Sequence, residues 1–102
     1  MARHNVESGI IFGISGALKE RATMMNGAVK QSNFHDYEVM RMADVPEINI
    51  EILPCGDRPS AVGELGLPTT APAIANAVHK MTGKRVRQMP MNSETILEAL
   101  KA

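Results

Sequence analysis

Three glycines are spaced along one face of the first predicted helix, and they restrict how this chain can pack. The helix is expected from Asn5 to about Glu20, with Asn5 as its N-cap, because apolar residues recur there at helical spacing. Gly9, Gly13 and Gly16 lie on a second face of it. A glycine inside a helix costs roughly 0.5–1 kcal/mol. Close packing against another backbone and close approach to a bulky cofactor both account for this face.

The composition is that of one small domain that has difficulty building its own core. Of 102 residues, 44% are hydrophobic but only 3% are aromatic, and eight methionines take part of the apolar role. Aromatic side chains bury the most area per residue, so a small chain without them is hard to stabilise alone. The segment 5–20 is apolar nearly all round, which predicts burial on more than one side. Both features indicate a partner polypeptide.

Charge and cysteine content exclude several classes of function. The formal net charge is zero, which argues against non-specific nucleic-acid binding. The basic cluster Lys80, Lys84, Arg85 and Arg87 is interpreted as a helix end and a solvated strand face, with a phosphate contact as the minor alternative. The single cysteine, Cys55, excludes an internal disulfide and any multi-cysteine metal site. No run approaches the ~20 apolar residues of a membrane span, and the sequence does not decide between cytoplasm and periplasm.

The middle of the chain predicts a hairpin followed by a loop. The pair Asn26-Gly27 fits a type I′ turn in a hairpin over residues 23–30. Residues 31–42 are polar and then mixed, which predicts a loop. The run His35 to Tyr37 lies in it, but adjacent residues of an extended segment point to opposite sides. We therefore expect neither a catalytic triad nor a metal pair there.

Strands and a last helix are predicted around a turn-rich loop. Isoleucines alternate with polar residues over 45–52, which predicts a strand with one buried face. Residues 54–59 form the loop, 84–89 a second short strand, and Asn92 or Ser93 caps the last helix. The apolar side of that helix comprises Ile96, Leu97 and Leu100. The order of elements predicts an α+β fold: a small, mostly antiparallel sheet with about three helices on one side.

One carboxylate stands out in the stretch from Ser60 to Arg87. Glu64 lies between Gly63 and Gly66, whose missing Cβ atoms allow close approach of a ligand and a positive φ. Pro68 prevents the loop from continuing as a regular element. The loop leads into a helix, and the free N–H groups of a helix N-terminus attract anions. Without further information, such a glutamate is more often a solvated turn residue than a catalytic group.

The helix after Glu64 has clear signals at both ends. Thr69 or Thr70 is expected to cap it, and Pro72 is expected in its first turn, where the missing N–H is not needed. Gly83 supplies the stop. Its apolar positions recur at helical spacing and comprise Ala71, Ile74, Ala75, Val78 and Thr82.

Four sequence blocks together carry a resemblance to a known family. They are G-I-I-F-G-I-S-G-A-L at 9–18, Q-S-N-F-H-D-Y at 31–37, A-V-G-E at 61–64, and A-P-A-I-A-N-A-V followed by T-G-K-R-V-R at 71–87. In this order and spacing they resemble the C-terminal end of the molybdopterin-binding subunit in the xanthine dehydrogenase and aldehyde oxidase family. The branch is the isoquinoline 1-oxidoreductase beta subunit and nicotinate dehydrogenase type. Residues 1–102 would then be the C-terminal segment of the molybdopterin-binding domain.

The resemblance implies a reaction and a set of site residues. Glu64 would be the general base in the oxidation of an N-heterocycle or an aldehyde with water as the oxygen source. The cofactor would be molybdenum–molybdopterin in its cytosine dinucleotide form, held without metal ligands from this chain. Iron–sulfur clusters on a partner subunit would take the electrons, and the remainder of the molybdopterin-binding subunit would be needed for activity. The implied cofactor contacts are Ser60, Ala61, Val62 and Gly63. The alternative is a non-catalytic remnant or small interaction module that docks on a larger partner.

Overall fold

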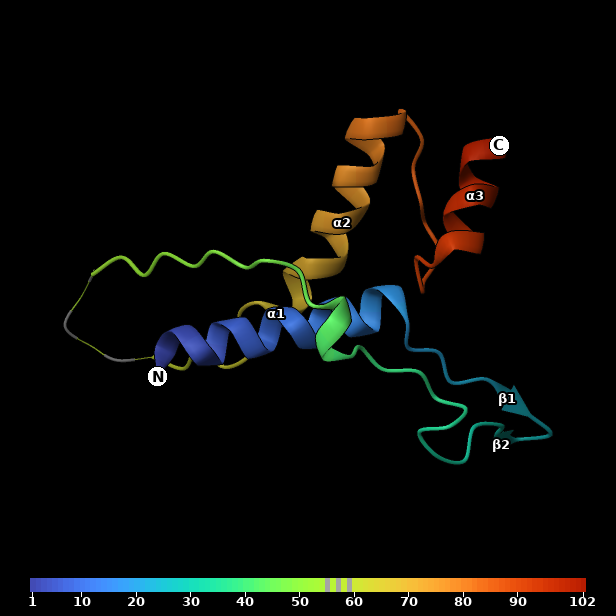
Figure 1. Cartoon of the computed structure of the whole chain (residues 1–102), viewed down its shortest axis with the longest axis horizontal. Coiled ribbons are helices and arrows are strands. Elements are labelled where there is room, and N and C mark those ends of the chain that lie inside the picture. Colours follow the sequence, from blue (N-terminus) through green and yellow to red (C-terminus); the bar gives the residue numbers. More distant parts are fainter. Residues whose placement is uncertain (55, 57, 59) are drawn as a thin grey trace.

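The computed structural model describes residues 1–54, 56, 58 and 60–102, and the predicted turn at Cys55, Asp57 and Pro59 lies outside them. Three helices and a two-stranded antiparallel sheet confirm the predicted α+β class (Figure 1). No helix in the described part of the chain is long and apolar enough to cross a bilayer. The elements are α1 (Ala2–Leu18), β1 (Met24–Met25), β2 (Ala28–Val29), the 3₁₀ helix η1 (Met42–Asp44), α2 (Leu67–Thr82) and α3 (Ser93–Lys101).

Helix α1 begins earlier than the sequence pattern predicts. It starts at Ala2, and the N–H of Asn5 already donates to the carbonyl of Met1 at 3.1 Å. Asn5 is therefore inside the first turn, and its predicted role as N-cap is wrong. The main chain of Met1 provides the acceptor, so the helix needs no side-chain cap at position 5. At the other end, the N–H of Lys19 donates to the carbonyl of Ser15 at 3.0 Å.

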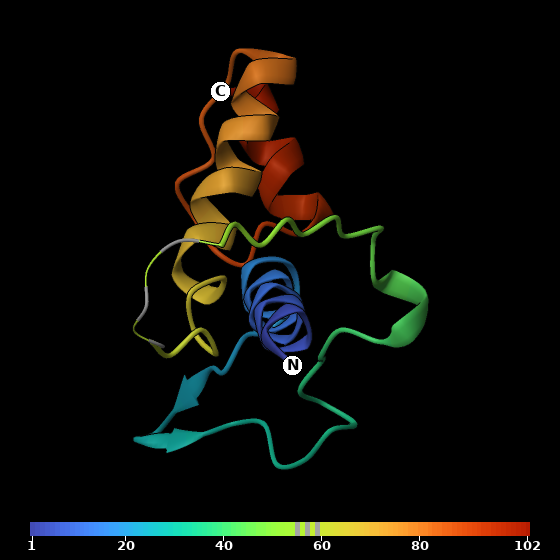
Figure 2. The ribbon, with the colours of Figure 1, turned by 90° about the vertical axis from the view of Figure 1, so that its left-hand side faces the viewer.

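Helices α1 and α2 cross in close contact because two glycines of α1 lack side chains. A Cβ at Gly13 would lie 2.7 Å from Oγ1 of Thr70 and 3.0 Å from the carbonyl oxygen of Leu67, and a Cβ at Gly9 would lie 3.0 Å from the carbonyl oxygen of Gly63. Figure 2 looks along α1 and shows α2 rising directly from its side. Close backbone packing, the first of the two interpretations of this face, is confirmed at Gly9 and Gly13. At Gly16 a Cβ would find only ordinary space.

The core lies where the C-terminal end of α1 meets α2, α3 and the segment between those two helices. Ala17, Val86 and Met91 are buried there, and the N–H of Met91 donates to the carbonyl of Ala17 at 2.7 Å. Partly buried residues pack around them: Leu18, Ala71, Ile74, Ala75, Val78, Ile96 and Ala99. Four of the five predicted apolar positions of α2 are confirmed in this way, whereas the fifth, Thr82, is exposed.

The inward face of α3 differs from the predicted one. Asn92 caps the helix as predicted, because its Oδ1 accepts the N–H of Thr95 at 2.9 Å. Ile96 packs against the core, but Leu97 is 54% exposed and Leu100 is 38% exposed. The small side chain of Ala99 takes the inward position instead. Two leucines of α3 therefore face away from the core that this chain provides.

The hairpin is confirmed, but the two longer predicted strands are not. Met24 pairs with Val29 and Met25 with Ala28, and Asn26 and Gly27 have φ of 51° and 79°, as a type I′ turn requires. Residues 45–52 and 84–89 are not strands in the described chain. Alternation specifies an extended shape and a face, but a strand also needs a hydrogen-bonding neighbour. The hairpin points away from the helices in Figure 1, so the predicted packing of helices on one side of a sheet is wrong.

A long loop after the hairpin is fastened back onto the C-terminal half of α1. Nζ of Lys19 contacts Oε1 of Glu38 at 3.1 Å and Oδ2 of Asp44 at 3.4 Å. The buried hydroxyl oxygen of Ser15 accepts the N–H of Met40 at 2.9 Å. The predicted loop over 31–42 is thus confirmed, and its path is fixed by charge and hydrogen bonding more than by apolar packing.

The close crossing predicts opposite effects for two glycine substitutions in α1. Gly13→Ala places a Cβ against Thr70 and the backbone of Leu67, so we expect a loss of about 1–3 kcal/mol in the free energy of unfolding. Gly16→Ala is the matched control, because its Cβ would meet only Oε2 of Glu20 at 3.9 Å, and we expect a gain of roughly 0.5–1 kcal/mol. Urea denaturation of both variants measures the difference. Equal stabilities would contradict the crossing geometry.

The loop anchor predicts an acid-sensitive step. The N–H of Arg41 and the ammonium of Lys19 lower the pKa of Asp44 below its ordinary 3.8. A lowered carboxyl pKa contributes stability above the ordinary value and loses it as the pH falls through the folded value. Below about pH 4, the resistance of the 38–44 segment to proteolysis should therefore fall. Asp44→Asn should remove most of that pH dependence, whereas Glu98→Gln on α3 should leave it unchanged.

Candidate functional site

The turn that carries Glu64 is positioned by its contact with α1. Gly66, the residue before α2, is buried, and a Cβ there would lie 2.7 Å from Cγ1 of Ile10 and 3.2 Å from the carbonyl oxygen of Val6. Gly9 faces the carbonyl of Gly63 in the same way. Both ends of the turn 63–66 therefore rest on the backbone of α1. This contact fixes where α2 starts and, with it, where Glu64 is held.

The start of α2 is stabilised differently from the prediction. The helix begins at Leu67 after Gly66, so Thr69 and Thr70 lie inside it, and their predicted role as N-caps is wrong. Their hydroxyls instead donate to the carbonyl of Gly66 at 3.3 and 2.6 Å. Pro72 lies beyond the first turn, where its missing N–H leaves the carbonyl of Pro68 without the usual helical donor. The two threonine hydroxyls hold the turn onto the helix.

The end of α2 is as predicted. Gly83 has φ of 74°, a left-handed conformation that favours glycine, and its N–H donates to the carbonyl of His79 at 2.7 Å. The basic residues that follow are exposed, as expected of a solvated segment. Helix α2 is therefore well defined at both ends, and its N-terminus is a rigid support for the preceding turn.

Glu64 lies on the surface of this chain. Its residue is exposed, and its main-chain carbonyl accepts the N–H of Leu67 at 3.3 Å. Within the described residues its carboxylate has no hydrogen-bond or ion-pair partner, so it is available for another contact. The neighbouring Leu65 is also 61% exposed. An acidic and an apolar side chain are thus neighbours on a turn that packs against α1 at both ends.

The residues implied as cofactor contacts precede Glu64 without interruption. Ser60, Ala61 and Gly63 are exposed, and Val62 is half-buried. A Cβ at Gly63 would meet no atom of the described chain within 4 Å. Neither Gly63 nor Gly66 has a positive φ, so the turn does not use the left-handed conformation that glycine allows. Gly66 is needed for packing on α1, whereas Gly63 leaves open space beside the main chain.

Other hollows of the surface lie apart from this turn. One of about 480 Å³ is apolar and lies between α1 and α2, with Ile10, Ile14 and Ile74 among its lining residues. Another of about 470 Å³ lies along α1 beside residues 39 and 40, with His4 and Glu7 in its wall. In the part of the chain that the structure describes, neither is lined by residues 60–66. The predicted site residues therefore form one side of a site, and the described chain does not provide the opposite side.

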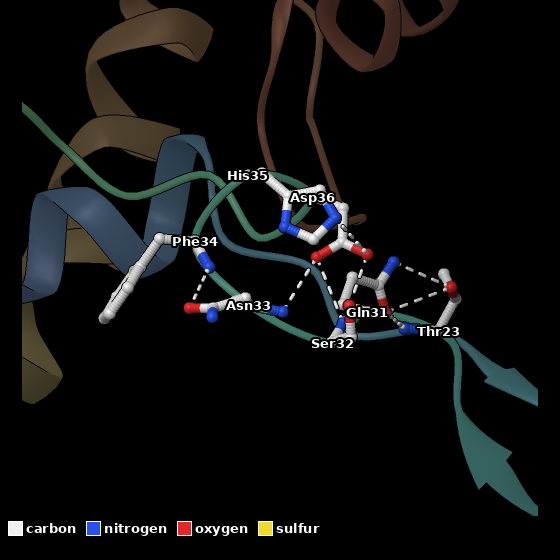
Figure 3. A network of polar contacts seen from close by, with 7 residues as sticks. All are labelled: Thr23, Gln31, Ser32, Asn33, Phe34, His35 and Asp36. Carbon is white, nitrogen blue, oxygen red and sulfur yellow. Dashed lines mark hydrogen bonds and ion pairs between the residues drawn. The ribbon is translucent and has the colours of Figure 1, made fainter.

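In the run from His35 to Tyr37, the side chains of Asp36 and Tyr37 make hydrogen bonds within the chain. Asp36 accepts the main-chain N–H groups of Ser32 and Asn33 at 3.0 and 3.1 Å (Figure 3), and these bonds, that from Asn33 foremost, lower its pKa. Nε2 of His35 is 3.7 Å from Oδ2 of Asp36. Asp36 therefore holds the loop together. No cluster of three metal-binding side chains is found among the described residues.

Tyr37 is turned toward α1. Its hydroxyl donates to Oε1 of Glu20 at 2.9 Å, and this hydrogen bond to a carboxylate raises the pKa of Tyr37. Sequence reasoning missed this contact and the one between Ser15 and Met40, because both join residues far apart in the chain. The sequence around Ser15 in α1 and around Glu20 just after it gave no signal for either contact.

Three known proteins similar to this chain are each much longer than it. The isoquinoline 1-oxidoreductase subunit beta of Brevundimonas diminuta is 41% identical over 91 residues, which are 89% of this chain and 12% of that protein. A membrane-bound aldehyde dehydrogenase of Gluconacetobacter polyoxogenes, whose name carries pyrroloquinoline quinone, is 35% identical over 98% of this chain and 13% of its own length. The aldehyde oxidoreductase molybdenum-binding subunit PaoC of Escherichia coli is 34% identical over 97% and 15%.

A solved structure shares the fold. The crystal structure of quinoline 2-oxidoreductase from Pseudomonas putida 86 matches 97% of this chain and 14% of its own, with a TM-score of 0.78 at 22% identity. No family model matches the sequence. This chain therefore belongs, as a segment about an eighth as long as its relatives, to the molybdenum hydroxylase family of isoquinoline, aldehyde and xanthine oxidoreductases, as its sequence blocks predicted.

Proposed function

We propose that this chain is the C-terminal segment of a molybdopterin-binding domain and supplies the general base of a molybdenum hydroxylase, Glu64. The whole enzyme would oxidise an N-heterocycle or an aldehyde and take the oxygen atom from water. The observation that carries the proposal is the placement of Glu64 on a turn fixed to α1, with its carboxylate exposed and unpaired among the described residues. The names of its relatives supply the reaction class.

The residues before Glu64 fit a molybdopterin cofactor. Ser60 and Ala61 are exposed and have small side chains, Gly63 is exposed and has none, and the space beside Gly63 is open. In the described chain, the main-chain N–H groups of residues 60–66 donate no recorded hydrogen bond. A polar, anionic cofactor needs such donors and close approach to the main chain. The relative whose name carries pyrroloquinoline quinone offers the competing cofactor, and metal analysis separates the two.

In the proposed mechanism, the protein positions the proton acceptor. Oxidation of a C–H group to C–OH with water releases two protons and two electrons in total. A carboxylate oxygen of Glu64 accepts one of these protons, and Val62 and Leu65 on either side present apolar groups that help to exclude bulk water. The molybdenum cofactor, when bound, would supply the redox centre and lower the pKa of the attacking water.

The rest of the site must come from other polypeptide. Glu64 is exposed here, and a general base acts efficiently only where substrate is held against it and water is limited. We propose that the remainder of the molybdopterin-binding subunit closes the site. The proposal also includes the cytosine dinucleotide form of the cofactor and an iron–sulfur partner subunit, which removes the electrons.

A second candidate is a non-catalytic module that docks on a larger partner. Four large apolar side chains are at least half exposed, which favours docking on some partner surface: Phe12, Leu53, Leu65 and Leu97. In that case Glu64 would have no role in turnover. Both candidates require a partner surface, so only the role of Glu64 separates them.

Replacement of the base tests the catalytic proposal directly. Glu64→Gln keeps the size of the side chain but removes the proton acceptor. Turnover by the assembled enzyme should fall by about 10²–10⁴-fold, while molybdenum content, measured by mass spectrometry of the metal, should stay unchanged. Glu98→Gln, an exposed glutamate on α3, should leave both values unchanged. Near-normal turnover of Glu64→Gln with full metal content would favour the docking module.

The open space beside Gly63 gives a separate test of the cofactor contact. Gly63→Ala should not destabilise this chain, because its Cβ would meet none of the described atoms. It would fill space assigned to the cofactor, at a cost of about 1–3 kcal/mol, which corresponds to a loss of roughly 5- to 150-fold in affinity. Molybdenum content after dialysis should therefore fall.

Gly66→Ala is the matched control for that test. It should lower stability, because its Cβ would lie 3.1 Å from the main-chain nitrogen of Ile10. Full molybdenum content in folded Gly63→Ala protein would remove the contact at Gly63 from the proposal.

A further inference from the structure

Residues 47–53 have the pattern of a strand without the neighbour that a strand requires. Ile48 and Ile50 are half-buried, whereas Glu47, Asn49 and Glu51 are exposed. In Figure 1 the segment runs as an extended green trace beside α1. Within the described residues, its main-chain N–H and C=O groups make no recorded hydrogen bond. Extended backbone that is held in place but unpaired is a template for another strand.

One face of this segment is already supported by the chain. Ile48 and Ile50, with Asn49 and Glu51 between and beside them, line a hollow of about 290 Å³ together with Arg3 and Glu7 of α1. Further along the same face, Ile52 is 50% exposed. The apolar side of the segment thus begins on α1 and continues beyond it onto open surface. Additional apolar side chains are needed to cover its second half.

The other face carries a specific charge pattern. Glu47 and Glu51 are four residues apart and therefore on the same side of an extended segment. Both are exposed, and in the described chain neither has an ion-pair partner. In paired strands, side chains directly opposite each other interact, and opposite charges there are favourable. The missing neighbour should therefore present lysine or arginine on this face.

The length of the relatives indicates where the neighbour comes from. The matching segment is only 12–15% of those proteins, so each has a large amount of further polypeptide. We propose that residues 47–53 become a β-strand by pairing with a strand from the remainder of the larger molybdopterin-binding subunit. That strand would be apolar toward α1 and basic opposite Glu47 and Glu51. The proposal rests on the proposed function only in placing this chain within a larger subunit.

Hydrogen–deuterium exchange compares the segment with and without its neighbour. The first sample is the full protein, purified from its source together with any longer polypeptide that contains this chain and any subunit bound to it. The second sample is the isolated 102-residue chain. In the full protein, amides of residues 48–52 should exchange at least about 100-fold more slowly than in the isolated chain. Peptides from α1 and α2 report in both samples whether the helices are folded. Unprotected amides at 48–52 in the full protein, with α1 and α2 protected, would overturn the proposal.

A second copy of this chain is the competing neighbour. If the isolated chain is dimeric by native mass spectrometry and its 48–52 amides are already protected, the partner is another copy and the proposal is wrong. If the isolated chain is monomeric and these amides exchange freely, the second copy is excluded.

Charge reversal tests the predicted chemistry of the neighbour. In the full protein, the double variant Glu47→Lys, Glu51→Lys should reduce protection of 48–52 by roughly tenfold. The double variant Glu94→Lys, Glu98→Lys has the same spacing and charge change on exposed positions of α3, and it should have no effect. Equal protection in both variants would contradict a basic partner face. The exchange comparison between the full protein and the isolated chain uses no variant, so it tests the proposal even if a variant fails to fold.

Metal content and turnover, measured on the same samples, separate this proposal from the proposed function. Protected 48–52 amides in a protein without molybdenum would leave the strand pairing in place and remove the enzymatic proposal. A molybdenum-loaded, active protein with unprotected 48–52 amides would support the enzymatic proposal and overturn the strand pairing.

Discussion

The crossing of α1 and α2 is the contact on which the rest of the structure depends. Gly9 and Gly13 on α1, together with Gly66 before α2, let two backbones approach within the distance that a Cβ would occupy. Such contact tolerates little displacement, because interiors are densely packed. The crossing therefore sets the start of α2, the turn before it and the position of Glu64. It also brings the C-terminal end of α1 to the core residues of the other helices.

Local patterns were enough to predict the helices, the hairpin and the element class, because each depends on neighbouring residues. Caps were predicted less well. Asn5 and Thr70 are suitable capping residues, but α1 already starts at Ala2 and α2 at Leu67, so both residues lie inside their helices. The strand over 45–52 failed for a different reason: its alternation is real, but no segment of the described chain pairs with it. Information about a partner is absent from local sequence.

The candidate site was predictable in its residues but not in its setting. The order of sequence blocks indicated Glu64 and the four residues before it, and in the structure residues 60–62 lead directly into the turn 63–66 that carries Glu64. It also separates two glycines that look equivalent in sequence, since Gly66 is packed against Ile10 while Gly63 borders open space. What encloses the turn depends on residues outside this chain, so no pattern within it could specify the pocket.

The shared volume of Ile10 and Gly66 has an evolutionary consequence. Cγ1 of Ile10 occupies the place that a side chain at position 66 would need. The main-chain nitrogen of Ile10 and the carbonyl oxygen of Val6 would also lie only 3.1 and 3.2 Å from that Cβ, so a smaller side chain at position 10 would not by itself make room for it. Selection should therefore keep glycine at position 66 whatever residue stands at position 10, although 55 residues separate the two in sequence.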